Sequence, residues 1–318
     1  MSEKIVFMGT PDFAVESLKQ LIENSENVVG VITSPDRPAG RGQQLRESAV
    51  KQFAVQHQIP VLQPEKLKSE EFINALREIN ADLFVVVAFR MLPEMVWDMP
   101  PKGTINLHGS LLPKYRGAAP INWAVINGDK ETGATTFFIE KEIDTGKIID
   151  NVKIPIGEED SAGAIHDKLM VAGATLLTNT VRHIFNGTAT AKDQSEFFET
   201  SELKHAPKIF KPDCKINWNN STLNIYNKIR GLSPYPAAWT ALKPAEGKTK
   251  SLKIFKTKPS VDHINHTGEI AVKEDGVFFG TNDGWLKIEE LQLEDKKRMS
   301  IDQFAQGFKF DTYDLVIL

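Results

Sequence analysis

The chain has 318 residues, which is long for one domain and sufficient for two. Hydrophobic residues at 41% and charged residues at 25% are typical of folded globular proteins and exclude extended disorder, while a single cysteine, Cys214, excludes an intramolecular disulfide framework. No apolar run approaches the roughly eighteen residues of a membrane span, and the short apolar stretch after Met1 is unlike a signal peptide, so we expect a cytoplasmic protein.

The first 189 residues alternate short apolar runs with segments of helical spacing, which predicts βαβ units and a mostly parallel sheet. The apolar runs predict strands at residues 4–8, 28–32, 82–88, 104–107 and 134–140. Helical spacing predicts one helix after the turn at residues 9–12 and another over residues 161–185, which ends before Asn186 and Gly187.

Residues 190–207 are polar with little periodicity, and we interpret them as a linker between two domains, 1–189 and 208–318. The second domain is predicted to contain a helix at 222–232 and short strands at 239–242, 252–256, 268–272, 277–280 and 286–293. Short strands separated by glycine turns are typical of a small β-barrel or sandwich.

Charge is distributed unevenly along the chain. Lys and Arg total 38 against 42 Asp and Glu, a net charge of −4, whereas residues 208–258 carry 11 basic and 2 acidic residues, a net charge of +9. A local excess of this size favours a polyanion such as nucleic acid as a partner. A lysine-rich solubilising surface explains the same count equally well.

The densest cluster of polar side chains lies at residues 104–113, where a predicted strand gives way to Gly, Ser and Pro. If the strand continues through His108, then Asn106 and His108 project from one face near its carboxyl end, where open α/β sheets bind ligands. An amide and an imidazole there could both donate to a developing oxyanion in acyl transfer. A purely structural polar pair is the alternative interpretation.

Asp144 is a second candidate, because a carboxylate can orient and charge an imidazole. An Asp before Thr-Gly is also a common turn former or helix cap. The local pattern does not show whether Asp144 meets His108.

Two prolines and two glycines predict no regular element at residues 34–42. Arg37 and Arg41 in this loop can bind phosphate or read bases, although a plain surface loop is an equal alternative. The seven histidines form no metal-binding spacing, so we expect no metal site.

Several motifs in fixed order resemble those of the folate-dependent formyltransferases across the first 187 residues. They are Gly9–Phe13, Pro35–Gly42, Asn106–Pro113, Arg116–Ile121, Gly128–Gly133 and Ile143–Gly146. The likeness continues more loosely through Arg230–Trp239, toward members of the family that formylate an aminoacyl-tRNA. It implies an α/β fold with an open, mostly parallel Rossmann-like sheet, followed by a small C-terminal OB-like β-barrel that binds tRNA.

The resemblance also implies an activity: a monomeric enzyme, without a metal, transfers the formyl group of the cosubstrate 10-formyltetrahydrofolate to the α-amino group of methionyl initiator tRNA. Asn106, His108 and Asp144 fall at the positions of the family's catalytic trio. Folate binding is expected from Ser110, Leu111, Leu112, Pro113, Phe89, Arg90, Met91 and Leu92. Binding of tRNA is expected from Arg37, Arg41, Lys208, Lys211, Lys215, Arg230, Lys248 and Lys250.

One departure from the family pattern keeps alternatives open. Arg90 stands where many relatives carry Gly, and it resembles transformylases of purine precursors or sugar nucleotides. An enzyme that formylates an amino sugar nucleotide is therefore the main alternative, opposed by the loop at 35–42 and by the basic C-terminal part. A formyltetrahydrofolate hydrolase is expected to begin with a small regulatory domain, which this sequence does not display. The intact catalytic trio opposes a non-catalytic RNA-binding protein.

Overall fold

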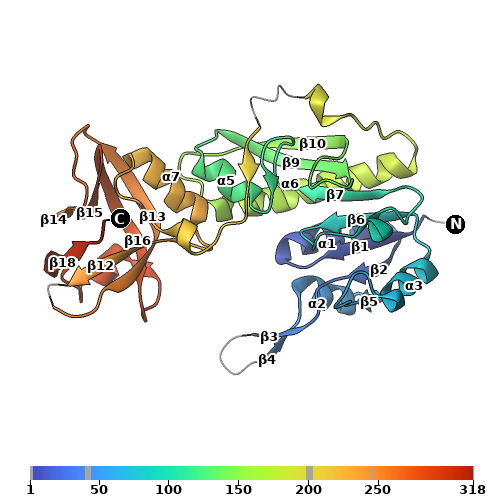
Figure 1. Cartoon of the computed structure of the whole chain (residues 1–318), viewed down its shortest axis with the longest axis horizontal. Coiled ribbons are helices and arrows are strands. Elements are labelled where there is room, and N and C mark those ends of the chain that lie inside the picture. Colours follow the sequence, from blue (N-terminus) through green and yellow to red (C-terminus); the bar gives the residue numbers. More distant parts are fainter. Residues whose placement is uncertain (1–2, 40–43, 198–202, 245, 318) are drawn as a thin grey trace. The chain divides into compact units, whose positions relative to one another are not determined.

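The computed structural model describes residues 3–39, 44–197, 203–244 and 246–317 (Figure 1). The chain divides into two compact units. The first unit comprises Met1–Pro120, Thr132–Ile154 and His166–Ala206, and the second comprises Ile121–Glu131, Pro155–Ile165 and Pro207–Leu318. Two short segments from the first half of the sequence thus belong to the second unit.

The first unit is built on a seven-stranded sheet with the order β10-β9-β7-β6-β1-β2-β5. The five strands from β7 to β5 are parallel, whereas β9 pairs with β7 in the antiparallel sense. This confirms the predicted Rossmann-like sheet. The strands are β1 (Ile5–Gly9), β2 (Val28–Ile32), β5 (Val61–Leu62), β6 (Leu83–Val87), β7 (Thr104–His108), β9 (Glu131–Phe138) and β10 (Ile148–Pro155).

Helices of the expected amphipathic kind accompany this sheet. In α1 (Asp12–Glu23), the apolar stripe buries Phe13, Ala14, Leu18 and Leu21. The long helix α6 (Ala162–Phe185) confirms the helix predicted at 161–185. The others in this unit are α2 (Ala49–Gln56), α3 (Glu70–Ile79) and α4 (Glu94–Trp97), whereas α5 (Pro120–Ile126) belongs to the second unit except for its first residue. None of the described helices is long and apolar enough to cross a membrane.

A hairpin replaces the irregular loop that was expected at residues 34–42. Strands β3 (Arg37–Ala39) and β4 (Gln44–Arg46) pair in the antiparallel sense, with Pro38 opposite Leu45. The prediction of no regular element is therefore wrong for this segment. A two-stranded ribbon tolerates proline because both of its strands are edge strands. The proline nitrogen, which carries no hydrogen, can therefore lie on the solvent side, where no hydrogen bond to a neighbouring strand is lost.

The predicted linker also has structure of its own. Strand β11 (His205–Ala206) pairs in parallel with β8 (Arg116–Gly117), and a 3₁₀ turn, η1, spans Gln194–Glu196. Ile148 and Lys192 exchange both backbone hydrogen bonds, each 2.9 Å long. The described part of residues 190–206 is therefore packed within the first unit.

The second unit contains an antiparallel, barrel-like sheet with the order β14-β15-β16-β13-β12-β18, and β17 pairs with β16 (Figure 1). All five strands predicted from the sequence are present, and helix α7 (Thr222–Leu232) has the predicted bounds. The elements are β12 (Ala238–Pro244), β13 (Lys250–Val261), β14 (Ile270–Lys273), β15 (Gly276–Thr281), β16 (Gly284–Leu293), β17 (Met299–Ser300), α8 (Ile301–Ala305), η3 (Pro212–Cys214), η4 (Phe310–Thr312) and β18 (Tyr313–Leu315).

Aromatic side chains fill the core of the second unit. Phe279 on β15 is fully buried and meets Trp218 and Phe310 edge-on, at centroid distances of 5.6 and 6.0 Å. Trp218 is also fully buried, and its Nε1 donates to Thr240 Oγ1 at 2.9 Å. Such pairs stabilise the core beyond the area that they bury.

Truncation of this aromatic centre tests the packing. We expect Phe279→Ala to lower the free energy of unfolding by about 3–5 kcal/mol, since it leaves a cavity among close-packed rings. Urea unfolding followed by tryptophan fluorescence measures the change. Leu223→Ala, at a side chain 54% exposed on α7, is the control, with an expected change below about 0.5 kcal/mol. Equal effects of the two substitutions would contradict this account.

Candidate active site

His108 is the last residue of β7, which lies between β6 and β9. Because the strand includes His108, Asn106 and His108 occupy alternate positions and share one face. His108 is 6% exposed, whereas Asn106 is partly exposed. Within the described part of the chain the Asn106 amide has no hydrogen-bond partner, so it is available to a ligand.

The carbonyl of Tyr115 fixes the imidazole of His108. Nε2 lies 2.9 Å from Tyr115 O, and because a carbonyl oxygen only accepts, Nε2 carries the hydrogen and donates. The other ring nitrogen, Nδ1, faces Asp144 Oδ2 at 3.8 Å. Nδ1 is therefore the ring nitrogen that remains open to the carboxylate and to a ligand.

Asp144 lies far from His108 in the sequence, and the tertiary structure brings the two side chains together. Its backbone has a left-handed φ of 55°, which Asp tolerates better than most residues. Oδ2 accepts the N–H of Gly117 at 2.9 Å, whereas Oδ1 has no hydrogen-bond partner among the described residues. The carboxylate is thus oriented through one oxygen and open at the other.

Two further residues hold the Asp144 loop, which we define as residues 139–147. A Cβ on Gly146 would lie 1.7 Å from Phe138 O, so the backbones approach too closely for another residue. Gln194 is 5% exposed, and its Nε2 donates to Asp144 O and to Gly146 O, each at 2.9 Å. Gln194 lies in the polar stretch interpreted as a linker, where periodicity gives no signal for a buried amide.

The two segments expected to bind folate follow neighbouring parallel strands, β6 and β7. Ser110, after β7, is fully buried, and its Oγ donates to Lys114 O at 2.6 Å. Leu112 and Pro113 are buried as well, while Leu111 is partly exposed. The Ser110 hydroxyl is therefore used to shape the loop.

In the segment after β6, Arg90 forms internal contacts. Its Nη2 and Nη1 donate to the carbonyls of Pro64 and Glu65 at 2.7 and 3.2 Å, and its guanidinium lies 5.3 Å from the Phe89 ring centroid. Burial lowers the pKa of Arg90 from its ordinary value, although the charge of Glu65 opposes this. Leu92 is buried, Met91 is 71% exposed and Phe89 is partly exposed, so this segment offers a thioether and part of an aromatic ring to a ligand.

The residues expected to bind tRNA have different surroundings. Arg37 is exposed on the hairpin, and Arg41 lies outside the described residues. Lys208, Lys211, Lys248 and Lys250 are exposed and Lys215 is partly exposed. None of these five lysines has an acidic partner among the residues that the structure describes. Their charges are therefore not neutralised locally.

Trp239 is the centre of one group of these lysines. Its Nε1 donates to Lys211 O at 2.9 Å, and Lys215 Nζ lies 5.6 Å from the ring centroid. Lys253 stands opposite Trp239 across the β12–β13 ladder and is exposed. We call Lys211, Lys215, Lys253 and Trp239 the basic patch. Lys253 was not among the residues predicted to bind tRNA, although it lies in the basic stretch 208–258, whose net charge favoured a nucleic-acid partner.

Arg230, also expected to bind tRNA, does not share this exposure. It is 7% exposed, and its Nη1 donates to the carbonyls of Gly157 and Asp160 while its Nε donates to Asn227. Burial lowers its pKa from the ordinary value. Nε and Nη1 are thus used within the second unit, whereas Nη2 has no hydrogen-bond partner among the described residues.

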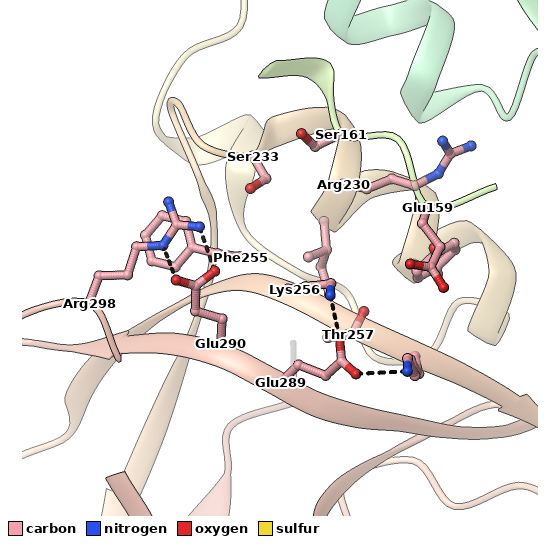
Figure 2. A pocket seen from close by; sticks show the side chains of 13 residues that line it. Glu159, Ser161, Arg230, Ser233, Phe255, Lys256, Thr257, Glu289, Glu290 and Arg298 are labelled. Carbon is pink, nitrogen blue, oxygen red and sulfur yellow. Dashed lines mark hydrogen bonds and ion pairs between the residues drawn. The ribbon is translucent and has the colours of Figure 1, made fainter. Parts of the chain in front are cut away.

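Arg230 lines a pocket of about 180 Å³ in the second unit, among charged residues that pair with one another (Figure 2). Lys256 and Lys258 both bind the carboxylate of Glu289, at 3.1 and 3.2 Å. Arg298 binds Glu290 through two nitrogens and lies over the ring of Phe255. The cations here are compensated, unlike those of the basic patch.

The described residues contain no group of three His, Cys, Asp or Glu side chains suited to hold a metal ion. The single cysteine, Cys214, is buried, and burial raises the pKa of its thiol above the ordinary value. Such a thiol is a poor nucleophile.

Comparison with known proteins agrees with this arrangement. The family model described as formyl transferase matches residues 3–181, and the model of the formyl transferase C-terminal domain matches residues 208–309. Curated proteins named methionyl-tRNA formyltransferase are similar over almost the whole chain. Those of Parabacteroides distasonis and Bacteroides thetaiotaomicron are 56% and 53% identical, and that of Flavobacterium johnsoniae is 46% identical, each over 96% of both chains.

Solved structures share the fold at low identity. A Helicobacter canadensis N-formyltransferase in complex with folinic acid and dTDP-3-aminofucose has a TM-score of 0.63 and 22% identity, over 93% of this chain and all of the other. HypX from Aquifex aeolicus in complex with tetrahydrofolic acid has a TM-score of 0.62 and 17% identity, over 96% of this chain and 47% of the other. With both domain models matched in order and full-length relatives above half identity, the chain belongs to the formyl transferase family, among the methionyl-tRNA formyltransferases.

Proposed function

We propose that this enzyme transfers the formyl group of 10-formyltetrahydrofolate to the α-amino group of methionyl initiator tRNA, with Asn106, His108 and Asp144 as its catalytic residues. The observation that carries the proposal is the meeting of His108 Nδ1 and Asp144 Oδ2 at 3.8 Å, on the face of β7 that also presents Asn106. Full-length relatives that carry the name methionyl-tRNA formyltransferase support the choice of acceptor.

The reaction begins with attack of the neutral amine on the formyl carbon. An α-amine titrates near pH 8, and an adjacent ester lowers this further, so the neutral form is readily available. The new C–N bond pushes an electron pair onto the formyl oxygen and creates a tetrahedral oxyanion. Collapse of the oxyanion breaks the bond to the folate nitrogen, which takes a proton as the amine loses one.

Each side chain has an atom suited to one of these steps. The Asn106 amide and the protonated Nδ1 of His108 donate to the oxyanion, since Nε2 is already bound to Tyr115. Asp144 stabilises the imidazolium through Oδ2, and its open Oδ1 accepts the proton released by the amine, directly or through water. A separation of 3.8 Å exceeds a direct hydrogen bond, so a proton on Nδ1 is not bound to Asp144 and can be donated to the substrate while the ring stays in place.

Folate is proposed to lie against the segments after β6 and β7. Met91, which is exposed, and Leu111 and Phe89, which are partly exposed, offer apolar surface there, and backbone groups of the two segments supply the polar contacts. Arg90 contributes by tying the first segment to the Pro64 and Glu65 carbonyls. Because its guanidinium is engaged in this way, Arg90 gives no independent support to a sugar-nucleotide acceptor.

Replacement of the oxyanion donors tests the catalytic assignment. We expect His108→Ala and Asn106→Ala each to lower kcat by about 100- to 1,000-fold, the usual effect of losing one oxyanion donor. Formation of N-formylmethionine on charged initiator tRNA measures kcat, and calorimetric titration with a reduced folate should show that binding persists. His57→Ala, at an exposed histidine of the same unit, is the matched control. Turnover near the native value in His108→Ala would refute the assignment.

For tRNA, we propose that the basic patch and the other unpaired lysines contact backbone phosphates. When a lysine binds a phosphate, counterions are released from the nucleic acid, which favours binding. A lysine without an acidic partner gains this fully, because it does not first have to break an ion pair within the protein. Trp239 within the patch adds a ring face that a base or a ribose can contact. Lys256, Lys258 and Arg298, which are held by Glu289 and Glu290, are expected to contribute less.

The salt dependence of tRNA binding distinguishes the two kinds of lysine. In Lys211→Ala, Lys215→Ala and Lys253→Ala, we expect the slope of log affinity against log salt to fall by about 1 each, as for one lost phosphate contact. Filter binding of initiator tRNA over a range of KCl concentrations measures the slope. Lys287→Ala, at a lysine paired with Asp275, is the control and should leave it unchanged. Unchanged slopes in all three patch variants would exclude the patch from the interface.

A further inference from the structure

We propose that Gln194 is a positioning residue for formyl transfer: its amide holds the Asp144 loop so that the carboxylate stays beside His108. The inference rests on the proposed catalytic role of Asp144 and adds a residue from a segment whose sequence predicts only a linker. Gln194 does not itself contact the imidazole or the carboxylate, so its effect on the reaction is indirect.

All the hydrogen-bonding groups of the Gln194 side chain are used. Oε1 accepts from Arg116 Nε at 3.1 Å and from Arg116 Nη2 at 2.7 Å. Nε2 donates to Asp144 O and Gly146 O, both at 2.9 Å. The side chain is 5% exposed, so water does not readily replace these four bonds.

The chemistry of the neighbours determines the orientation of this amide. A guanidinium can only donate and a backbone carbonyl can only accept, so the Gln194 oxygen must face Arg116 and its nitrogen must face the loop. A carboxylate at this position would keep the contact with Arg116 but could not donate to the two carbonyls. An aliphatic side chain of similar size would lose both sets of bonds.

The Asp144 loop follows β9 and folds back against the end of the same strand, so its backbone has to be held in a tight turn. Phe138 N donates to Lys147 O at 3.0 Å, which closes the ends of the loop, and Gly117 N binds the carboxylate of Asp144. Gln194 donates hydrogen bonds to the backbone carbonyls on both sides of Thr145, and one of these carbonyls belongs to Asp144, whose φ is positive. Rotation of this short stretch would move the Asp144 carboxylate relative to His108.

The segment that carries Gln194 is anchored independently of its side chain. The backbone bonds between Lys192 and Ile148, and the ion pair of Asp193 with Lys147 at 3.8 Å, hold the segment beside the loop. Arg116, which donates to Gln194, and Gly117, whose N–H orients the Asp144 carboxylate, together form β8. Gln194 therefore also contacts the strand that orients Asp144. Substitution of Gln194 should therefore loosen the loop without detaching the segment.

Steady-state kinetics of the full-length enzyme test this role. We expect Gln194→Leu and Gln194→Glu to lower kcat by about 10- to 100-fold, as for a catalytic group displaced by up to about 1 Å. The KM for 10-formyltetrahydrofolate should change by less than about threefold, because the folate segments are not held by Gln194. Gln56→Leu is the matched control, because the Gln56 side chain is exposed and forms no hydrogen bond with the described residues.

A double-mutant cycle separates positioning from general damage. In an Asp144→Ala background, Gln194→Leu should cause no further loss of kcat, since the group that it positions is already absent. Losses that multiply, or a Gln194→Leu enzyme within about twofold of the native kcat, would overturn the inference. Native turnover in Asp144→Ala alone would instead refute the proposed role of Asp144, so the two failures are distinguishable. Circular dichroism and the melting temperature of each variant check that it is folded.

Discussion

One close approach of backbone, that of Gly146 to the carbonyl of Phe138, sets the geometry of the active site. A side chain at Gly146 would overlap this oxygen, so the chain can turn back against β9 only where glycine stands. The turn places Asp144 at a positive φ with its carboxylate toward Gly117 and His108. An imidazole and a carboxylate that are distant in the sequence meet for this reason.

The surrounding hydrogen bonds then determine which atoms of His108 and Asp144 remain open to a ligand. A carbonyl binds His108 Nε2 and an N–H binds Asp144 Oδ2, so one nitrogen and one oxygen remain for the substrate. In the proposed reaction neither group has to reorganise before the oxyanion forms, which is the condition for strong electrostatic stabilisation. The buried position of the ring on β7 and its bond to Tyr115 O keep the orientation of His108 fixed.

In the second unit, the positive charge of residues 208–258 divides into three environments. Lys211 and Lys215 are unpaired beside Trp239, Lys256 and Lys258 share the carboxylate of Glu289, and Arg230 is buried among backbone carbonyls. A nucleic acid gains most from the first group, because binding there breaks no existing ion pair. Net charge alone therefore overstates the surface available to tRNA.

The sequence by itself determined five strands of the sheet in the first unit, the long helix α6, the five long strands of the second unit, the bounds of α7 and the basic stretch. These features follow from local periodicity, motif spacing and composition. Only the tertiary structure decided that Asp144 meets His108, that Gln194 is buried against the Asp144 loop, that Arg37 lies on a hairpin, and that Arg230 is internal. Such pairings join segments that are far apart in the chain. The packing of the backbone selects the partner of each polar group, and local sequence patterns do not predict this packing.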